Sequence, residues 1–180
     1  MIRQSIKENT KDIHRYVENL PIMKKIVGRT VGPEAYTNYL VQIRAIYSAI
    51  ENNPAYTRLG WGLSLGGNYK RDIDEMKKMF EIDHVSVSEI TSIYCRYLSE
   101  MIDSETIAAH AYVRYMADLM GGSVIKRRLN SEWSSTAYDL DRGGKDIIVE
   151  YLNNEIQDSD SFLREVYNSF MSHAAILHEC

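Results

Sequence analysis

Proline, the residue that interrupts helices most strongly, occurs only in the first third of this chain, at Pro21, Pro33 and Pro54. The rest of the chain can therefore form long helices, and apolar residues recur along it with the spacing that places them on one helix face. No segment alternates apolar and polar residues with β-branched side chains on one face, as a strand would. The pattern predicts an all-α fold, a single multi-helix domain over residues 1–180.

Helix boundaries follow from the same pattern and from its breaks. Pro21 and Pro33 open helices, and four glycines between residues 55 and 68 indicate a loop or a broken helix. Ser86, with Glu89, is expected to cap a helix, and Asp103 or Ser104 to cap the next. A polar loop is expected at 130–143. The predicted helices cover about residues 1–20, 21–28, 33–51, 69–82, 86–102, 105–129, 145–156 and 159–178.

Composition limits the classes of function. The net charge is −4 and the pI about 5.7, so no overall basic character points to nucleic acid. Two cysteines do not make a disulfide framework, which fits a reducing compartment. Residues 1–20 hold no apolar signal core, and no apolar run is long enough for a membrane helix. We therefore expect a cytoplasmic protein without a membrane anchor.

Four polar residues of the first predicted helix, Lys7, Lys11, His14 and Glu18, are spaced so that they share one face. The simplest interpretation is a solvated polar face. The alternative is a cofactor site, because a neutral imidazole can ligate iron and lysines can meet the carboxylates of a porphyrin. Lys7 lies about 10.5 Å along the helix from His14, near the separation of iron and propionate. That alternative requires a second wall for the ring.

Two adjacent glycines, Gly121 and Gly122, lie inside the predicted helix 105–129, where each costs roughly 1 kcal/mol relative to alanine. Without side chains, the helix backbone can approach a flat ring closely and can bend over it. A close crossing of two helices would need small residues for the same reason. Both interpretations of the glycine pair stay open from these residues alone.

The segment AHAYVRYMADLMGGSVIK, together with TKDIHRYVENLPIM near the start, resembles the haem oxygenase family. The order and separation of the two segments match as well, and the likeness covers most of the chain, least in 55–85 and 130–160. It implies that His14 ligates the iron of haem, and that Asp118, Arg114 and Tyr47 form the catalytic group. The other residues that it implies for haem binding are Lys7, Lys11, Glu18, Tyr112, Ala117, Gly121, Gly122 and Lys145.

The resemblance also implies a reaction and partners. Haem is both cofactor and substrate, and is cleaved to biliverdin, carbon monoxide and ferrous iron with O2 and electrons from a donor such as ferredoxin or a flavin reductase. Asp118 is expected to act through water, which relays protons more gently than direct contact. The cluster Lys126–Arg128 is either a solvated helix end or a docking patch for an acidic donor.

Three positions depart from the family pattern. Ala117 stands where the family has glycine, Met120 where it has serine, and Val149 where it has an arginine partner for a propionate. These changes leave open a haem-binding or haem-sequestering protein with weak or no ring-cleaving activity. A third alternative is a fold relative with unrelated chemistry, such as the thiaminase-like group, which would bind no haem.

For several side chains a purely structural role, without catalysis or ligand binding, is also expected. Asp118 can form a surface ion pair with Arg114, four residues earlier, worth only about 0.3–0.5 kcal/mol. His110 is expected to be structural and Cys95 to be a core thiol, because no base lies beside it. His173 and His178, on the last helix, are expected to be partly exposed.

Overall fold

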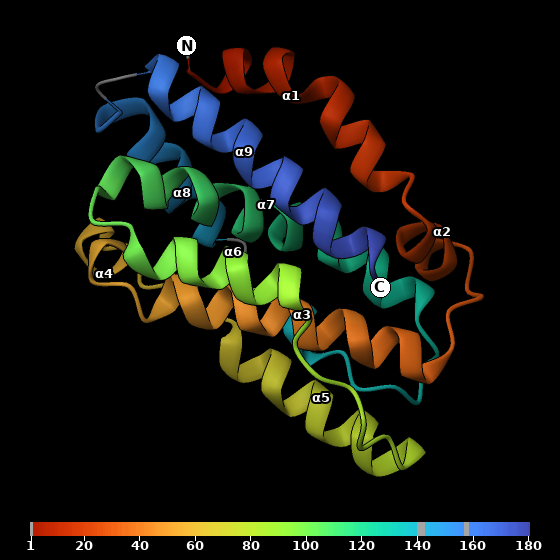
Figure 1. Cartoon of the computed structure of the whole chain (residues 1–180). Helices are drawn as coiled ribbons and strands as arrows, with labels where there is room; N and C mark the ends of the chain where they lie inside the picture. The colour runs from red at the N-terminus through yellow and green to blue at the C-terminus, as the bar shows by residue number, and fades with distance from the viewer. Residues whose placement is uncertain (1, 140–142, 157–158) are drawn as a thin grey trace.

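The computed structural model describes residues 2–139, 143–156 and 159–180, and this part of the chain contains helices and loops but no strand. The all-α prediction is therefore confirmed. Figure 1 shows the arrangement, with α9 crossing the molecule between α1 and α6 and with α5 at the lower edge. The helices are α1 (Ile2–Glu18), α2 (Pro21–Val27), α3 (Pro33–Glu51), α4 (Pro54–Leu59), α5 (Gly66–Phe80), α6 (Glu89–Glu100), α7 (Ser104–Arg128), the short 3-10 turn η1 (Thr136–Tyr138), α8 (Gly143–Asn154) and α9 (Ser159–His178).

Each proline is the first residue of a helix, where its missing N–H costs nothing and its fixed φ favours the helical turn. Of the two alternatives for 55–68, the broken helix is confirmed, because helical residues lie on both sides of a non-helical stretch. Pro54 opens the short helix α4, the Asn53 side chain caps it, and Gly60 ends it at φ 68°.

Helix α5 begins at Gly66, three residues before its predicted start. The Glu51 carboxylate accepts hydrogen bonds from the backbone N–H of Leu65 at 2.6 Å and of Gly66 at 3.1 Å, which satisfies donors that the first turn leaves free. A Cβ at Gly66 would lie only 3.0 Å from Glu51 Oε2. The last two of the four glycines, Gly66 and Gly67, thus begin a helix whose first N–H groups are bound by the distant carboxylate of Glu51.

Two helix caps test the sequence assignments. Ser88, not Ser86, caps α6 by accepting from the backbone N–H of Thr91 at 3.2 Å. Asp103 caps α7 by accepting from the N–H of Thr106 at 2.7 Å, as one of the two expected alternatives. The assignment of Ser86 was wrong because the chain before α6 is irregular up to Ser88, whose extended φ and ψ are those of a helix cap.

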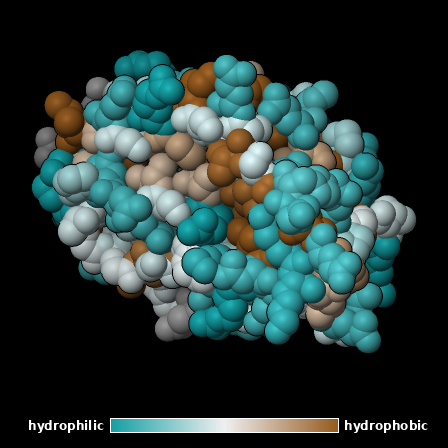
Figure 2. Space-filling view, turned by 60° about the horizontal axis from the view of Figure 1, so that its bottom comes forward, coloured by the Kyte–Doolittle hydropathy of each residue, from teal (hydrophilic) through white to brown (hydrophobic). Residues whose placement is uncertain are grey.

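The buried core is one connected cluster that extends from Ile6 in α1 to Leu177 in α9. Helix α3 lies inside it and packs against α5, α6 and α7, while α9 packs against both α1 and α7. The apolar residues that helical spacing places on one face of α3 are all buried: Tyr36, Tyr39, Leu40, Ile43, Ile46, Tyr47 and Ile50. Figure 2 brings the lower side of the molecule forward and shows a mostly hydrophilic surface with apolar residues gathered near its centre. Among the described residues, no helix combines the length and apolar character needed to cross a bilayer.

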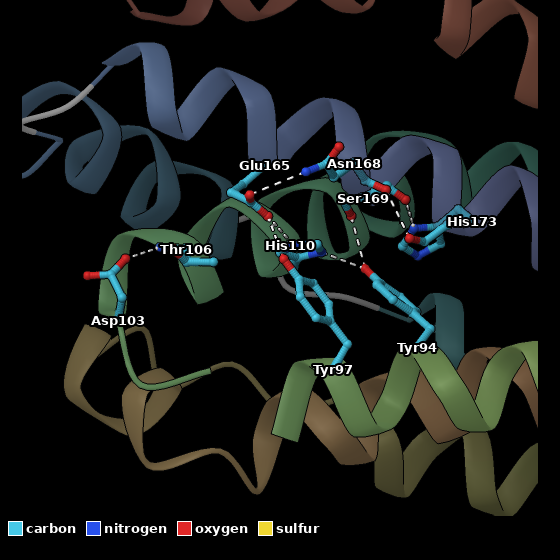
Figure 3. A network of polar contacts seen from close by, with 10 residues as sticks. Tyr94, Tyr97, Asp103, Thr106, His110, Glu165, Asn168, Ser169 and His173 are labelled. Carbon is cyan, nitrogen blue, oxygen red and sulfur yellow. Dashed lines mark hydrogen bonds and ion pairs between the residues drawn. The ribbon is translucent and has the colours of Figure 1, made fainter. Parts of the chain in front are cut away.

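A polar network joins α6, α7 and α9 behind this core (Figure 3). The buried His110 ring lies between Tyr94, whose hydroxyl is 2.7 Å from Nδ1, and Glu165, whose Oε2 is 3.1 Å from Nε2. Tyr94 also meets Ser169 Oγ at 3.2 Å, so the three helices share one set of hydrogen bonds. These contacts agree with a structural role for His110.

The last two histidines and Cys95 differ in how far they are buried. His173 is buried rather than partly exposed, with Nδ1 2.7 Å from the Ser169 carbonyl oxygen, because it faces α6 and α7. His178, at the end of α9, is exposed as expected. Cys95 is half-buried, and burial raises the pKa of its thiol to about 11, as suits an unreactive cysteine.

Candidate functional site

Helix α7 presents an apolar face to solvent around the glycine pair. Ala117, Met120 and Val124 are exposed, with 56% of Met120 accessible, and Gly121 lies among them. These positions are three or four residues apart and so share one side of the helix. Large exposed apolar groups on one face mark a surface that a ligand can cover.

Asp118, three residues before Gly121, is buried on the adjacent side of α7. Its Oδ2 accepts hydrogen bonds from the hydroxyls of Tyr47 at 2.6 Å and Tyr69 at 2.8 Å, and its Oδ1 accepts from Arg114 Nη2 at 2.7 Å. The Arg114–Asp118 pair is thus buried, not the surface pair considered above. A buried charge without such partners would be strongly destabilised, so the four groups form one unit.

The charges of this unit are fixed by its surroundings. Burial, and then the Asp118 charge, raise the pKa values of Tyr47 and Tyr69 well above their ordinary values, so both phenols stay protonated donors. Arg114 stays charged, because Asp118 and nearby tyrosines outweigh the effect of its burial and raise its pKa. The cluster therefore holds one guanidinium beside the carboxylate.

The two glycines of α7 meet different surroundings. A Cβ at Gly121 would find no atom within 4 Å, whereas a Cβ at Gly122 would stand 3.0 Å from Cδ1 of Tyr138. Tyr138 belongs to η1, whose turn is held by Asp72: Oδ2 of Asp72 accepts from the N–H of Ala137, and Oδ1 from the N–H of Thr136. Gly122 is thus explained by packing within the chain, and only Gly121 leaves open space.

The polar stripe on α1 is exposed as a whole. Of the side chain of His14, 56% is accessible; Nδ1 is 3.5 Å from Glu18 Oε1, and the ring meets Phe170 of α9 edge-on at 5.6 Å. Nε2 of His14 has no hydrogen-bond partner among the described residues. Lys7 and Lys11 are exposed on the turns that precede it. An imidazole with one free nitrogen and a carboxylate beside the other suits a metal ligand.

Helix α9 packs against both α1 and α7, so the two helices that carry these groups are connected through it. Arg3, at the start of α1, acts electrostatically on Tyr112 of α7, where burial raises the phenol pKa and Arg3 partly offsets the rise. A cavity of about 210 Å³ is lined by Leu119, Met120, Ser123 and Lys145. Ligand pockets commonly hold roughly 300–1,000 Å³, so a haem here would also cover the exposed face of α7.

Tyr69 and Arg3 were not among the residues predicted from the sequence. Tyr69 begins the predicted helix 69–82, in the part of the chain where the resemblance is least, so nothing pointed to a contact with Asp118. Arg3 continues the basic stripe one turn before Lys7, and that spacing could have identified it. The side chain of Val149 is half-buried on α8.

Comparison with known proteins gives one family. A family model described as Heme oxygenase matches residues 1–172. Curated relatives include a "Heme oxygenase" of Porphyra purpurea, 26% identical over 78% of this chain and 66% of its own, and "Heme oxygenase 1" of Bos taurus, 29% identical over 70% of this chain. The chain spans less than two thirds of the length of either relative, 47% of the bovine protein.

Solved structures agree in fold. Heme oxygenase from Leptospira interrogans superposes with a TM-score of 0.84 and 21% identity, covering 99% of both chains. Heme oxygenase-1 from Synechocystis, solved in complex with heme, gives a TM-score of 0.81 and 19% identity, covering 99% of this chain and 91% of the other. At these identities the likeness establishes the helical fold.

Proposed function

The chain belongs to the haem oxygenase family, and from this premise we propose that it binds haem and cleaves it to biliverdin, carbon monoxide and ferrous iron. One observation carries the proposal. The protein combines an exposed imidazole with a free nitrogen, His14 on α1, with an open apolar helix face at Gly121 and a buried, hydrogen-bonded carboxylate, Asp118, both on α7.

The residues present fit a bound haem. His14 would ligate the iron through Nε2, with Glu18 beside Nδ1, and Gly121 with Ala117 and Met120 would lie over the other face of the ring. The propionates would meet lysines, which are mobile point charges suited to carboxylates at a protein surface: Lys7, Lys11 and the cavity-lining Lys145. Bound haem supplies the iron that binds O2.

Asp118, buried beside the exposed face of α7, would control proton delivery to the bound ligand. A carboxylate has about four lone-pair sites, and three are taken by Tyr47, Tyr69 and Arg114. One acceptor site on Oδ1 remains for a water, which can relay protons to the reacting oxygen without direct contact. Arg114 and Tyr47 would hold this carboxylate in place through their hydrogen bonds.

The electron donor is proposed from surface charge. Arg29 Nη2 donates to the Arg127 carbonyl oxygen at 3.2 Å, which joins the end of α2 to the end of α7. Exposed cations gather at this junction, while Lys126 is paired with Asp139. The exposed cations are Lys24, Lys25, Arg29, Arg127 and Arg128. Such a surface favours an acidic donor of the ferredoxin type and speeds its association.

The test is an anaerobic haem titration followed by reduction in air, with products identified by mass. A bilin together with carbon monoxide supports the proposal. A stable ferrous-oxy spectrum with no bilin would instead assign a haem-sequestering protein, in which Met120 and Ala117 hinder turnover. A protein that binds no haem would contradict both assignments.

A further inference from the structure

We propose that Tyr69 is a positioning residue for Asp118: with Tyr47 it occupies both lone pairs of Oδ2, so that a water can be held only at Oδ1. The inference deepens the proposed function and rests on it, because that water matters only where an oxygen ligand is processed. Tyr69 lies on α5, a helix to which sequence analysis assigned no part in the site.

The geometry restricts the carboxylate from two sides. The Tyr47 and Tyr69 hydroxyls reach the same oxygen of Asp118 at 2.6 and 2.8 Å, and their rings lie 5.3 Å apart at an interplanar angle of 30°. Both rings are fully buried and come from different helices, α3 and α5. Rotation of Asp118 would therefore break two hydrogen bonds inside a packed core.

The number of hydrogen bonds that each oxygen of Asp118 accepts shows where a water can bind. Oδ2 of Asp118 has two lone pairs, and both accept a phenol, whereas Oδ1 accepts only Arg114. Without Tyr69 the Oδ2 atom could also bind water, and the position of a proton donor would become ambiguous. Tyr69 thus selects one oxygen of the carboxylate.

Tyr69 also connects Asp118 to the glycine pair. Its ring meets Tyr138 edge-on at 6.2 Å, and Tyr138 packs where a side chain on Gly122 would lie. The sequence of contacts runs from the carboxylate through two rings to the backbone beside Gly121. A substitution at Tyr69 should therefore alter the packing of the α7 face that is proposed to contact haem.

The first experiment needs no haem. Buried hydroxyl protons of Tyr47 and Tyr69 should give two downfield proton resonances in the apoprotein. Tyr69→Phe should remove one and move the other further downfield, because Tyr47 becomes the sole donor to Oδ2. Tyr36→Phe is the matched control, since Tyr36 is a fully buried tyrosine whose hydroxyl is not a donor to Asp118.

The second experiment uses the ferric haem complex and follows the acid–alkaline transition of its absorption spectrum. Tyr69→Phe removes one hydrogen bond that screens the charge of Asp118, and the less screened charge opposes a second negative charge nearby, so the midpoint should rise by roughly 0.5 pH unit. Tyr47→Phe should shift it in the same direction, and Tyr36→Phe should not shift it.

The outcomes separate the two proposals. If Tyr69→Phe keeps the wild-type midpoint while Tyr47→Phe changes it, the role of Tyr69 is refuted and the haem site stands. If no form binds haem, the proposed function fails, and the hydroxyl resonances then decide alone whether Tyr69 holds Asp118. Unchanged resonances in Tyr69→Phe would overturn the inference in either case.

Discussion

The Tyr138 ring lies directly against Gly122: a Cβ at Gly122 would stand 3.0 Å from Cδ1 and 3.4 Å from Cβ of Tyr138. One glycine of the pair in α7 is therefore required by the chain's own packing. A Cβ at the neighbouring Gly121 would meet no atom within 4 Å, so packing within the chain does not explain why glycine occupies that position. The two glycines should respond differently to the same substitution.

Alanine at each glycine tests this division. Gly121→Ala should stabilise the apoprotein by up to about 1 kcal/mol, because alanine favours the helix and meets no neighbour. Gly122→Ala should lose that gain and cost about 1–3 kcal/mol, because a rigid ring must move. Urea unfolding monitored by circular dichroism measures both. Equal effects would refute the assignment of Gly122 to Tyr138.

Asp72 holds Tyr138 in place through the turn η1, so its charge should matter to stability. Asp72→Asn replaces one acceptor oxygen by a donor facing the N–H and hydroxyl groups of 134–137, and should cost roughly 2–3 kcal/mol. Asp74→Asn is the control on the same helix, since its exposed pair with Lys70 contributes under about 1 kcal/mol. Comparable losses in thermal melts would show that the buried contacts of Asp72 contribute little.

The parts of the fold and of the candidate site that depend on local sequence pattern could be predicted. The buried stripe of α3, the proline-marked helix starts and the i,i+4 pairing of Arg114 with Asp118 follow from spacing. Tyr47, 71 positions from Asp118, was named only through the resemblance to the family. Tyr69 could not be found, because its contact with Asp118 joins residues 49 positions apart and neither spacing nor the resemblance pointed to it. The burial of the Arg114–Asp118 pair was also not predicted, because an i,i+4 spacing places two residues on one helix face but does not say whether that face is buried.

His14 tests the proposed iron ligand. Because more than half of its side chain is exposed and, within the described part of the chain, it contacts only Glu18, at 3.5 Å, and the edge of Phe170, His14→Ala should change stability by less than about 0.5 kcal/mol. The same variant should lose the absorption spectrum of histidine-ligated haem, and added imidazole should restore it. His84→Ala, also exposed, is the control. A wild-type spectrum in His14→Ala would refute the ligand assignment and leave the fold untouched.

His173 gives the folded protein a sensitivity to acid. Burial, and then the nearby Arg114 charge, lower its pKa from 6.5 to about 3, while its Nδ1 stays 2.7 Å from the Ser169 carbonyl. Between those values the unfolded chain binds one more proton at this site, so stability rises with pH there and is lost as the pH falls.

Substitution of His173 should therefore flatten the pH dependence of unfolding. Wild type should lose roughly 2 kcal/mol from this group between pH 7 and pH 5, and His173→Gln should lose that much less over the same interval. Glu165, whose lowered pKa starts from 4.5, contributes only at lower pH. His84, whose pKa is raised beside Glu34, acts in the opposite direction but equally in both proteins, so the difference between them isolates His173. Urea unfolding at pH 5, 6 and 7 measures it, with His178→Gln as the exposed control on the same helix. Parallel curves for wild type and His173→Gln would show that His173 does not set this acid response.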